Sequence, residues 1–101
     1  MSADLVVWAV SSSLFCAGAA FLVLRRQLVA LVIGVELMVN AANILIVFHA
    51  ARLGDPQGLA VAFLALAAAA AEVVVGLALI LALRHDELEA PETSHLEELA
   101  G

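Results

Sequence analysis

The sequence predicts an all-α membrane protein with three transmembrane helices and a short acidic C-terminal tail. Hydrophobic residues make up 65% of its 101 residues, and the mean hydropathy of +1.13 lies well above that of soluble globular domains. The apolar residues fall into three runs of about 20 residues or more, the helix length that crosses a bilayer core of about 30 Å. We therefore expect a three-helix membrane domain over residues 1–84 and an acidic tail over residues 85–101.

The first predicted span, residues 5–24, contains no charged side chain. It does not resemble a secretory signal, because the basic residues Arg25 and Arg26 follow the apolar run instead of preceding it. We expect the serines at 11–13 to hydrogen-bond to their own backbone or to a neighbouring helix. The small residues at 16–20 provide a surface suited to close helix contact.

The second and third spans are predicted over residues 28–50 and 59–83. Residues 25–27 leave room for only a tight turn before the second span. A polar connection over residues 51–58 separates the second span from the third and contains the turn residues Gly54, Asp55, Pro56 and Gly58. In the tail, Ser94-x-x-Glu97 is a weak match to a helix capping box.

Composition excludes several classes of protein. The formal net charge is −6, and without a basic patch we expect no nucleic-acid partner. The single cysteine cannot form an internal disulfide. The three histidines, His49, His85 and His95, do not cluster in the sequence, so we expect no metal site. No glycine-rich phosphate loop or catalytic triad spacing is present, and we expect no cofactor on this chain.

The arginines predict the orientation of the chain in the membrane. With three spans, the turn at residues 25–27 and the C-terminus lie on one side, together with Arg25, Arg26 and Arg84. The N-terminus and the 51–58 connection lie on the other side, with Arg52 alone. By the positive-inside rule the C-terminus is cytoplasmic and the N-terminus lies outside the cell inner (plasma) membrane.

The second span carries a polar stripe inside an otherwise apolar run. At about 100° per residue, Asn40 lies about 40° from Glu36 on the helix and Asn43 about 20° to the other side. The three side chains therefore share one narrow face. The two amides can donate and accept hydrogen bonds and can hold water beside Glu36, although an asparagine pair is more often a contact between helices.

The third span contains a second acid, Glu72. Counting about 1.5 Å per residue from the cytoplasmic ends of the spans, Glu36 and Glu72 lie at depths of roughly 14 and 18 Å, close to the centre of the bilayer. Each acid at a helix centre costs about 2.5–3.5 kcal/mol on insertion scales, which demands a compensating environment. Depth-matched acids can exchange protons. The simpler alternative is that each acid pairs with an arginine or lysine of another subunit and serves assembly.

Three segments together resemble a known family: RRQL at 25–28, GVELMVNAANI at 34–44 and AAAEVVVGLAL at 69–79. They are similar to the K subunit of bacterial complex I, the proton-pumping NADH:quinone oxidoreductase. The resemblance covers roughly residues 20–84, and the combination of E-L-M-x-N-A-x-N with a later A-E-x-x-x-G-L-A-L is specific. The tail departs from the family pattern, because it is more acidic and ends in LEELAG.

The resemblance implies a non-redox membrane-arm subunit whose Glu36 and Glu72 relay protons that couple quinone reduction to pumping. Arg25 and Arg26 match the family's arginine pair, and the resemblance implies that they support coupling from the cytoplasmic side. The implied partners are the lipid bilayer and other membrane-arm subunits, including antiporter-like subunits. Quinone, NADH, FMN and iron–sulfur clusters are expected elsewhere in the complex.

Other classes remain open at the level of sequence. The C subunit of multisubunit cation/proton antiporters shares the three-helix plan. A structural or pore-forming small membrane protein is a different class, and it predicts that replacing Glu36 and Glu72 by glutamine leaves energy coupling intact. A rotary-ring proteolipid fits poorly, because such proteins have two helices and one essential acid.

Overall fold

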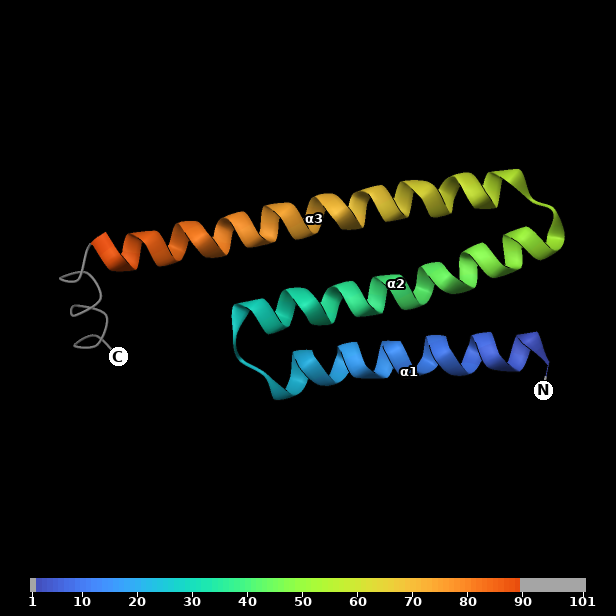
Figure 1. Ribbon diagram of the computed structural model, residues 1–101, viewed down its shortest axis with the longest axis horizontal. Coiled ribbons are helices and arrows are strands. Elements are labelled where there is room, and N and C mark those ends of the chain that lie inside the picture. The colour runs from blue at the N-terminus through green and yellow to red at the C-terminus, as the bar shows by residue number, and fades with distance from the viewer. Residues whose placement is uncertain (1, 90–101) are drawn as a thin grey trace.

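The computed structural model describes residues 2–89, with side chains up to His85. It contains three helices, α1 (Ala3–Leu24), α2 (Leu28–Leu53) and α3 (Pro56–Glu89), and no strand within this range. They run up, down and up, and α2 lies between α1 and α3 (Figure 1). The predicted fold class is confirmed for the helices. Most of the acidic tail, with Pro91 and the capping-box match at Ser94 and Glu97, lies outside the described residues.

All three helices are long and apolar enough to cross a membrane. Among the side chains that the structure describes, few are buried between the helices, and the buried hydrophobic ones are all alanines: Ala30, Ala41, Ala50, Ala62 and Ala69. The large leucine, valine and phenylalanine side chains point outward instead, and several are more than half exposed. A protein whose outer surface contacts lipid and neighbouring helices shows this distribution, since association in a membrane depends on close packing of small residues.

The helices extend beyond the predicted spans, and the connection expected over residues 51–58 shrinks to two residues. Gly54 ends α2 in the left-handed conformation (φ 65°), which glycine adopts without strain. Asp55 then caps α3, because its Oδ1 accepts a hydrogen bond from the Gln57 N–H at 3.0 Å. Pro56 takes the first helical position, where no N–H is needed. The turn residues were correctly identified, but they form helix caps instead of an eight-residue loop.

The third helix also continues past residue 83, the end of the predicted span, to Glu89. No glycine or proline interrupts the sequence between Gly76 and Pro91, so helix propensity carries the backbone beyond the apolar run. Hydropathy places a boundary at residue 84 because the polarity of the sequence changes there, but the helix continues across it.

Small residues join α1 to α2 at close range. Gly18 and Gly34 are buried against each other, and a Cβ atom added at Gly18 would lie only 2.5 Å from the Gly34 carbonyl oxygen. Nearby, the Ser11 Oγ donates a hydrogen bond to the Ala41 carbonyl oxygen at 2.6 Å. Ser13 donates to the carbonyl of its own helix instead, at Ala9. Both expected modes of serine bonding are thus confirmed.

A second α1–α2 contact lies at the end of the helices near the N-terminus. Arg52 forms an ion pair with Asp4, and its guanidinium lies over the Phe48 ring at 5.7 Å from the centroid. His49 meets Trp8 edge to face. This group therefore ties the start of α1 to the end of α2. It also places His49 on the α1 side of α2, away from the stripe that contains Glu36, as the helical spacing predicted.

Candidate functional site

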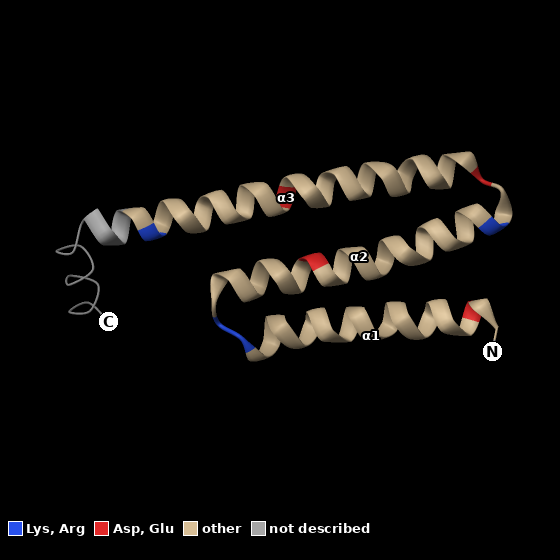
Figure 2. Ribbon diagram, in the orientation of Figure 1, with Lys and Arg blue, Asp and Glu red and all other residues tan. Residues whose placement is uncertain are grey.

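Two acids lie inside membrane-spanning helices, Glu36 on α2 and Glu72 on α3. Figure 2 shows acidic positions in the middle of these two helices, whereas the other charged positions of the described chain lie at or near helix ends. Among the described residues, neither acid has a hydrogen-bond or ion-pair partner. Polar groups at this depth without a partner in their own subunit are typical of functional or assembly sites.

The packing of α3 on α2 sets the two acids at the same level. Gly58 packs against Ala50, and Gly76 packs against Val32, which fixes the antiparallel register. Glu36 lies four residues after Val32, and Glu72 lies four residues before Gly76. Because the helices run in opposite directions, both steps lead to the same level along the pair. The depth match inferred from sequence therefore agrees with the helix register.

The polar stripe of α2 turns toward α3 and toward one flank of the α2–α3 contact. Val32 and Ala50 contact α3, and they lie at the same angle around the axis of α2, so a line through them along the helix marks the side that faces α3. Measured from that line at about 100° per residue, Asn43 lies about 20°, Glu36 about 40° and Asn40 about 80° around the helix, all in the same direction. Glu36 and Asn43 are accordingly half-buried, whereas Asn40 is exposed.

Glu72 lies on the opposite flank of the same contact. The buried line of α3 runs through Ala62, Ala69 and Gly76. At about 100° per residue, Glu72 lies about 60° to one side of that line and Leu66 about 60° to the other. Glu72 is exposed, and Leu66 borders the same groove as Asn40 and Asn43. The acids share a level but do not point at each other, a difference that depth counting does not detect.

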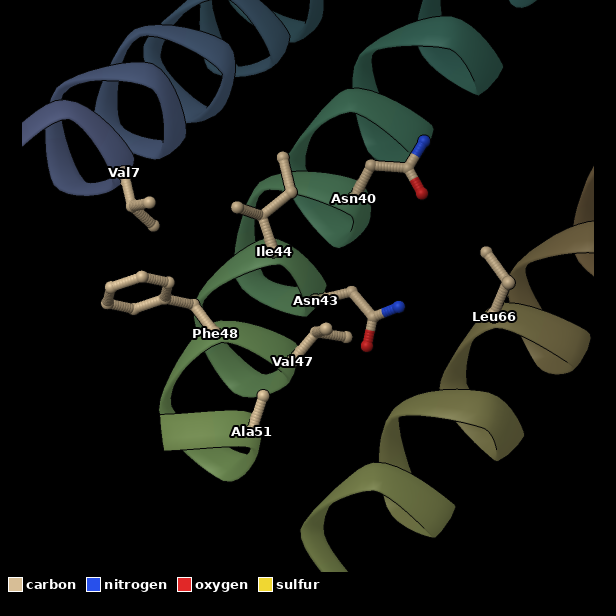
Figure 3. Close-up of a pocket in the computed structure, with 8 residues that line it drawn as sticks. All are labelled: Val7, Asn40, Asn43, Ile44, Val47, Phe48, Ala51 and Leu66. Carbon is tan, nitrogen blue, oxygen red and sulfur yellow. The ribbon is translucent and has the colours of Figure 1, made fainter. Parts of the chain in front are cut away.

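A groove of about 660 Å³ runs along α2 between its two neighbours. Figure 3 shows the amides of Asn40 and Asn43 directed toward α3, where Leu66 lies opposite. The Asn43 Oδ1 atom is buried and has no hydrogen-bond partner in the part of the chain that the structure describes. Toward the N-terminal end of α1 the groove is lined by apolar side chains only, namely Val7, Ile44, Val47, Phe48, Ala51 and Leu66. Its polar part is therefore confined to the two asparagines.

Leu66 is the site residue that sequence reasoning missed. A leucine in an apolar run carries no signal of its own, but counting residues outward from the Gly54–Asp55 turn places it opposite Asn43. The register of the helix pair was thus the information needed to find it. The position of Leu66 opposite Asn43 can be derived only when Gly58 and Ala50 are known to be in contact.

The arginine pair lies apart from the acids, at one end of the helices. Arg25 and Arg26 are exposed in the short connection between α1 and α2. Gln27 and Arg84 border one hollow of about 340 Å³, so Arg84 lies at the same end of the molecule. Arg52, at the other end, is paired with Asp4. Three arginines are thereby gathered at one end and one at the other.

No group of three or more histidine, cysteine, aspartate or glutamate side chains that could hold a metal occurs within the described region. What the chain does present is a pair of mid-helix carboxyl groups, two amides and a cluster of arginines at one end. Carboxyl groups accept and donate protons, and amides hold water. The chemistry available here is therefore proton transfer and hydration.

These features define a small integral membrane subunit of three helices, with two acids inside its spans. The family model for NADH-ubiquinone/plastoquinone oxidoreductase chain 4L matches residues 6–99. A protein of Deinococcus radiodurans named NADH-quinone oxidoreductase subunit K is 39% identical over 92 residues, which is 91% of this chain and 85% of that protein. Proteins of the same name are 40% identical over 75 residues in Salinibacter ruber, 74% of each chain, and 41% identical over 83 residues in Anaeromyxobacter dehalogenans, 82% of this chain and 83% of that protein. No solved structure matches the chain.

The chain belongs to the chain 4L/subunit K family and is a multi-pass membrane subunit of complex I, the NADH-quinone oxidoreductase. The resemblance stated from its motifs is confirmed. Its partners accordingly include other subunits of that complex. The family assignment also favours complex I over the C subunit of a cation/proton antiporter.

Proposed function

We propose that this chain relays protons through Glu36 and Glu72 and so couples quinone reduction elsewhere in complex I to proton pumping. The observation that supports the relay most directly is the common level of the two acids on neighbouring helices. A carboxyl group at this depth can accept a proton, hold it and donate it through a bridging water. Asn40 and Asn43 support the relay by hydrogen-bonding such water beside Glu36.

Proton transfer between the two acids has to cross the α2–α3 contact, because they lie on opposite flanks of it. Ala69 and Gly76 form that contact on the α3 side near the level of Glu72. Small side chains leave more room for a water molecule or a moving carboxyl group than leucine or phenylalanine would. The route proposed for the proton is therefore Glu36, the small-residue contact and then Glu72.

The relay is tested with Glu36→Gln and Glu72→Gln in the whole complex, reconstituted into vesicles. Glutamine keeps the size and hydrogen bonding of the side chain but cannot carry the proton. We expect each variant to lose most of the proton pumping that accompanies NADH oxidation. Asp4→Asn is the matched control, because it removes a carboxylate at the helix end.

Assembly of the complex is measured separately on native gels. Normal pumping in a fully assembled Glu36→Gln complex would contradict the relay. Failure of both glutamine variants to assemble would instead support a pairing role for the acids, and normal pumping in both variants would favour a purely structural subunit.

We further propose that the N-terminus lies outside the inner membrane and the C-terminus in the cytoplasm. The support is the gathering of Arg25, Arg26 and Arg84 at one end of the helices. Gln27→Cys and Gln57→Cys, made separately in a Cys16→Ala background, form a matched pair at the two ends. An impermeant thiol reagent added to intact cells is expected to label the variant at Gln57 only. Labelling of the variant at Gln27 alone would contradict this proposal and show that the C-terminus lies outside.

Arg25 and Arg26 are proposed to support coupling from the cytoplasmic side, since both are exposed in the α1–α2 turn, which the proposed orientation places on that side. Replacing both by alanine is expected to lower pumping, and replacing both by lysine to restore it if charge is what matters. Unchanged pumping in the assembled double-alanine complex would contradict this role.

The remaining proposals concern what lies beyond this chain. We propose that it is a non-redox subunit, and that quinone, NADH, FMN and the iron–sulfur clusters are bound by other parts of the complex. Neighbouring membrane-arm subunits, including the antiporter-like ones, are proposed to cover its exposed apolar faces together with lipid. Cross-linking of this chain within the purified complex identifies those neighbours.

A further inference from the structure

The two helix contacts of this subunit differ in kind. The α1–α2 contact is held by the Ser11 hydrogen bond to the Ala41 carbonyl, by backbone packing at Gly18, and by the Asp4–Arg52 ion pair. Between residues 58 and 80, by contrast, no side-chain hydrogen bond or ion pair joins α3 to α2. The structure thus consists of a fastened α1–α2 pair with α3 resting against it.

The face of α3 that rests against α2 consists mainly of small residues, and Val73 and Ile80 are the larger side chains half-buried on it. Its most buried side chains are Ala62, 3% exposed, and Ala69, 4% exposed, and its close contacts are made by Gly58 and Gly76. Helices that interlock do so through large side chains seated between the side chains of the partner. Alanine and glycine supply no such side chain, so a turn of α3 about its axis has to displace only the half-buried Val73 and Ile80 from the α2 side.

Two features of the site point to the same rotation. Glu72 lies about 60° away from the contact line on one flank, and Leu66 lies about 60° away on the other. The Asn43 Oδ1 atom is buried on the flank of Leu66 and has no hydrogen-bond partner among the described residues. A rotation that brings Glu72 into the contact also carries Leu66 away from Asn43.

We propose that α3 turns by about 60° against the fastened α1–α2 pair, which brings Glu72 into the contact at the level of Glu36 and moves Leu66 away from Asn43. The inference rests on the proposed proton relay and supplies its moving part. In the arrangement seen here the two carboxyl groups lie on opposite flanks of the contact, and the Asn43 Oδ1 atom is buried without a partner among the described residues. In the turned arrangement Glu72 faces Glu36, and water bound by Asn43 and Asn40 lies beside them.

Cysteine pairs distinguish the two arrangements. Val39 lies seven residues after Val32 and Ala69 seven before Gly76, so these two residues are opposite each other in the present arrangement. Ala68 is exposed and approaches Val39 only after the turn. The pairs Val39→Cys with Ala69→Cys and Val39→Cys with Ala68→Cys are made in the whole complex, in a Cys16→Ala background.

We expect the Ala69 pair to form a disulfide readily in the resting complex and the Ala68 pair to react about tenfold more slowly, because a disulfide requires Cβ atoms within about 3.5–4.5 Å. During NADH oxidation the Ala68 pair should react about tenfold faster than at rest. A reaction rate of the Ala68 pair that turnover leaves unchanged would overturn the proposal.

A disulfide between α2 and α3 tests whether proton pumping requires the turn of α3. Oxidation of the Val39→Cys, Ala69→Cys complex is expected to abolish proton pumping, and reduction of the disulfide to restore it. The matched control fastens α1 to α2 instead, through Ser11→Cys with Ala41→Cys, and should leave pumping unchanged when oxidised. Normal pumping in the fully oxidised Val39→Cys, Ala69→Cys complex overturns the turning of α3, even where Glu36→Gln abolishes pumping and the relay itself stands.

Discussion

The contact between Gly18 and Gly34 makes a quantitative prediction about stability. A Cβ atom added at Gly18 would lie 2.5 Å from the Gly34 carbonyl oxygen, about 0.9 Å inside the 3.4 Å at which ordinary contact begins, and 2.7 Å from Met38 Cγ. A backbone carbonyl in a helix cannot move aside, so Gly18→Ala has to push the helices apart. Overpacking of this kind costs about 1–3 kcal/mol, and the Ser11 bond lost on separation adds about 1 kcal/mol.

The gain in helix propensity on replacing glycine by alanine offsets about 0.5–1 kcal/mol of that cost, which leaves a net destabilisation of about 2 kcal/mol. Gly76→Ala is the matched control, because its added Cβ would lie 3.3 Å from Val32 Cγ2, a side-chain atom that can shift by a few tenths of an ångström. Here the propensity gain remains, and we expect no loss of stability.

Trp8 reports the separation of α1 from α2. It is the only tryptophan of the chain, and it packs edge to face against His49 on α2, with 5.9 Å between ring centroids. Unfolding of the purified subunit in detergent micelles, titrated with sodium dodecyl sulfate, is followed by its fluorescence. A difference of about 2 kcal/mol corresponds to about a 30-fold change in the ratio of folded to unfolded protein. A Gly18→Ala subunit that unfolds at the same point as the wild type would refute the steric reasoning.

Three smaller effects follow from the same contacts and can be measured in the same titration. Ser11→Ala removes a hydrogen bond between helices and should destabilise by about 0.5–1.5 kcal/mol, whereas Ser13→Ala removes a bond within α1 and should change little; equal effects would contradict the distinction. Asp55→Ala removes the N-cap of α3 and should cost about 0.5–2 kcal/mol, which Asp55→Asn should largely restore. Arg52→Ala breaks an exposed ion pair and should lower the free energy of unfolding by no more than about 1 kcal/mol. A larger decrease would show that the contact between Arg52 and Phe48 also stabilises the subunit.

Much of the fold follows from the sequence because in a membrane every backbone amide must be bonded within its own segment, which makes a long apolar run a helix. The helix ends were harder to place. Hydropathy ends the second span at residue 50 and begins the third at residue 59, but Gly54, Asp55 and Pro56 supply a complete pair of caps between them. Capping is a local interaction that hydropathy does not detect.

The site was predictable in part for a similar reason. Helical periodicity alone places Glu36, Asn40 and Asn43 on one face, and counting residues from the helix ends brings Glu72 to the same depth. Neither count reveals which face of α3 meets α2. The packing of the two helices places Leu66 on the same groove as Asn43 and leaves Glu72 on the opposite flank.

The sequence by itself determines that this protein has three membrane helices, with two acids at one depth and a family motif around each. These properties depend on the identity of residues along one helix at a time. The tertiary structure decides how the helices are rotated about their axes: α1 is fastened to α2 by Ser11 and the glycine contact, and α3 lies on α2 through alanine and glycine. Only the tertiary structure shows how each helix is rotated about its axis, because that rotation depends on which small residues allow the closest approach between helices.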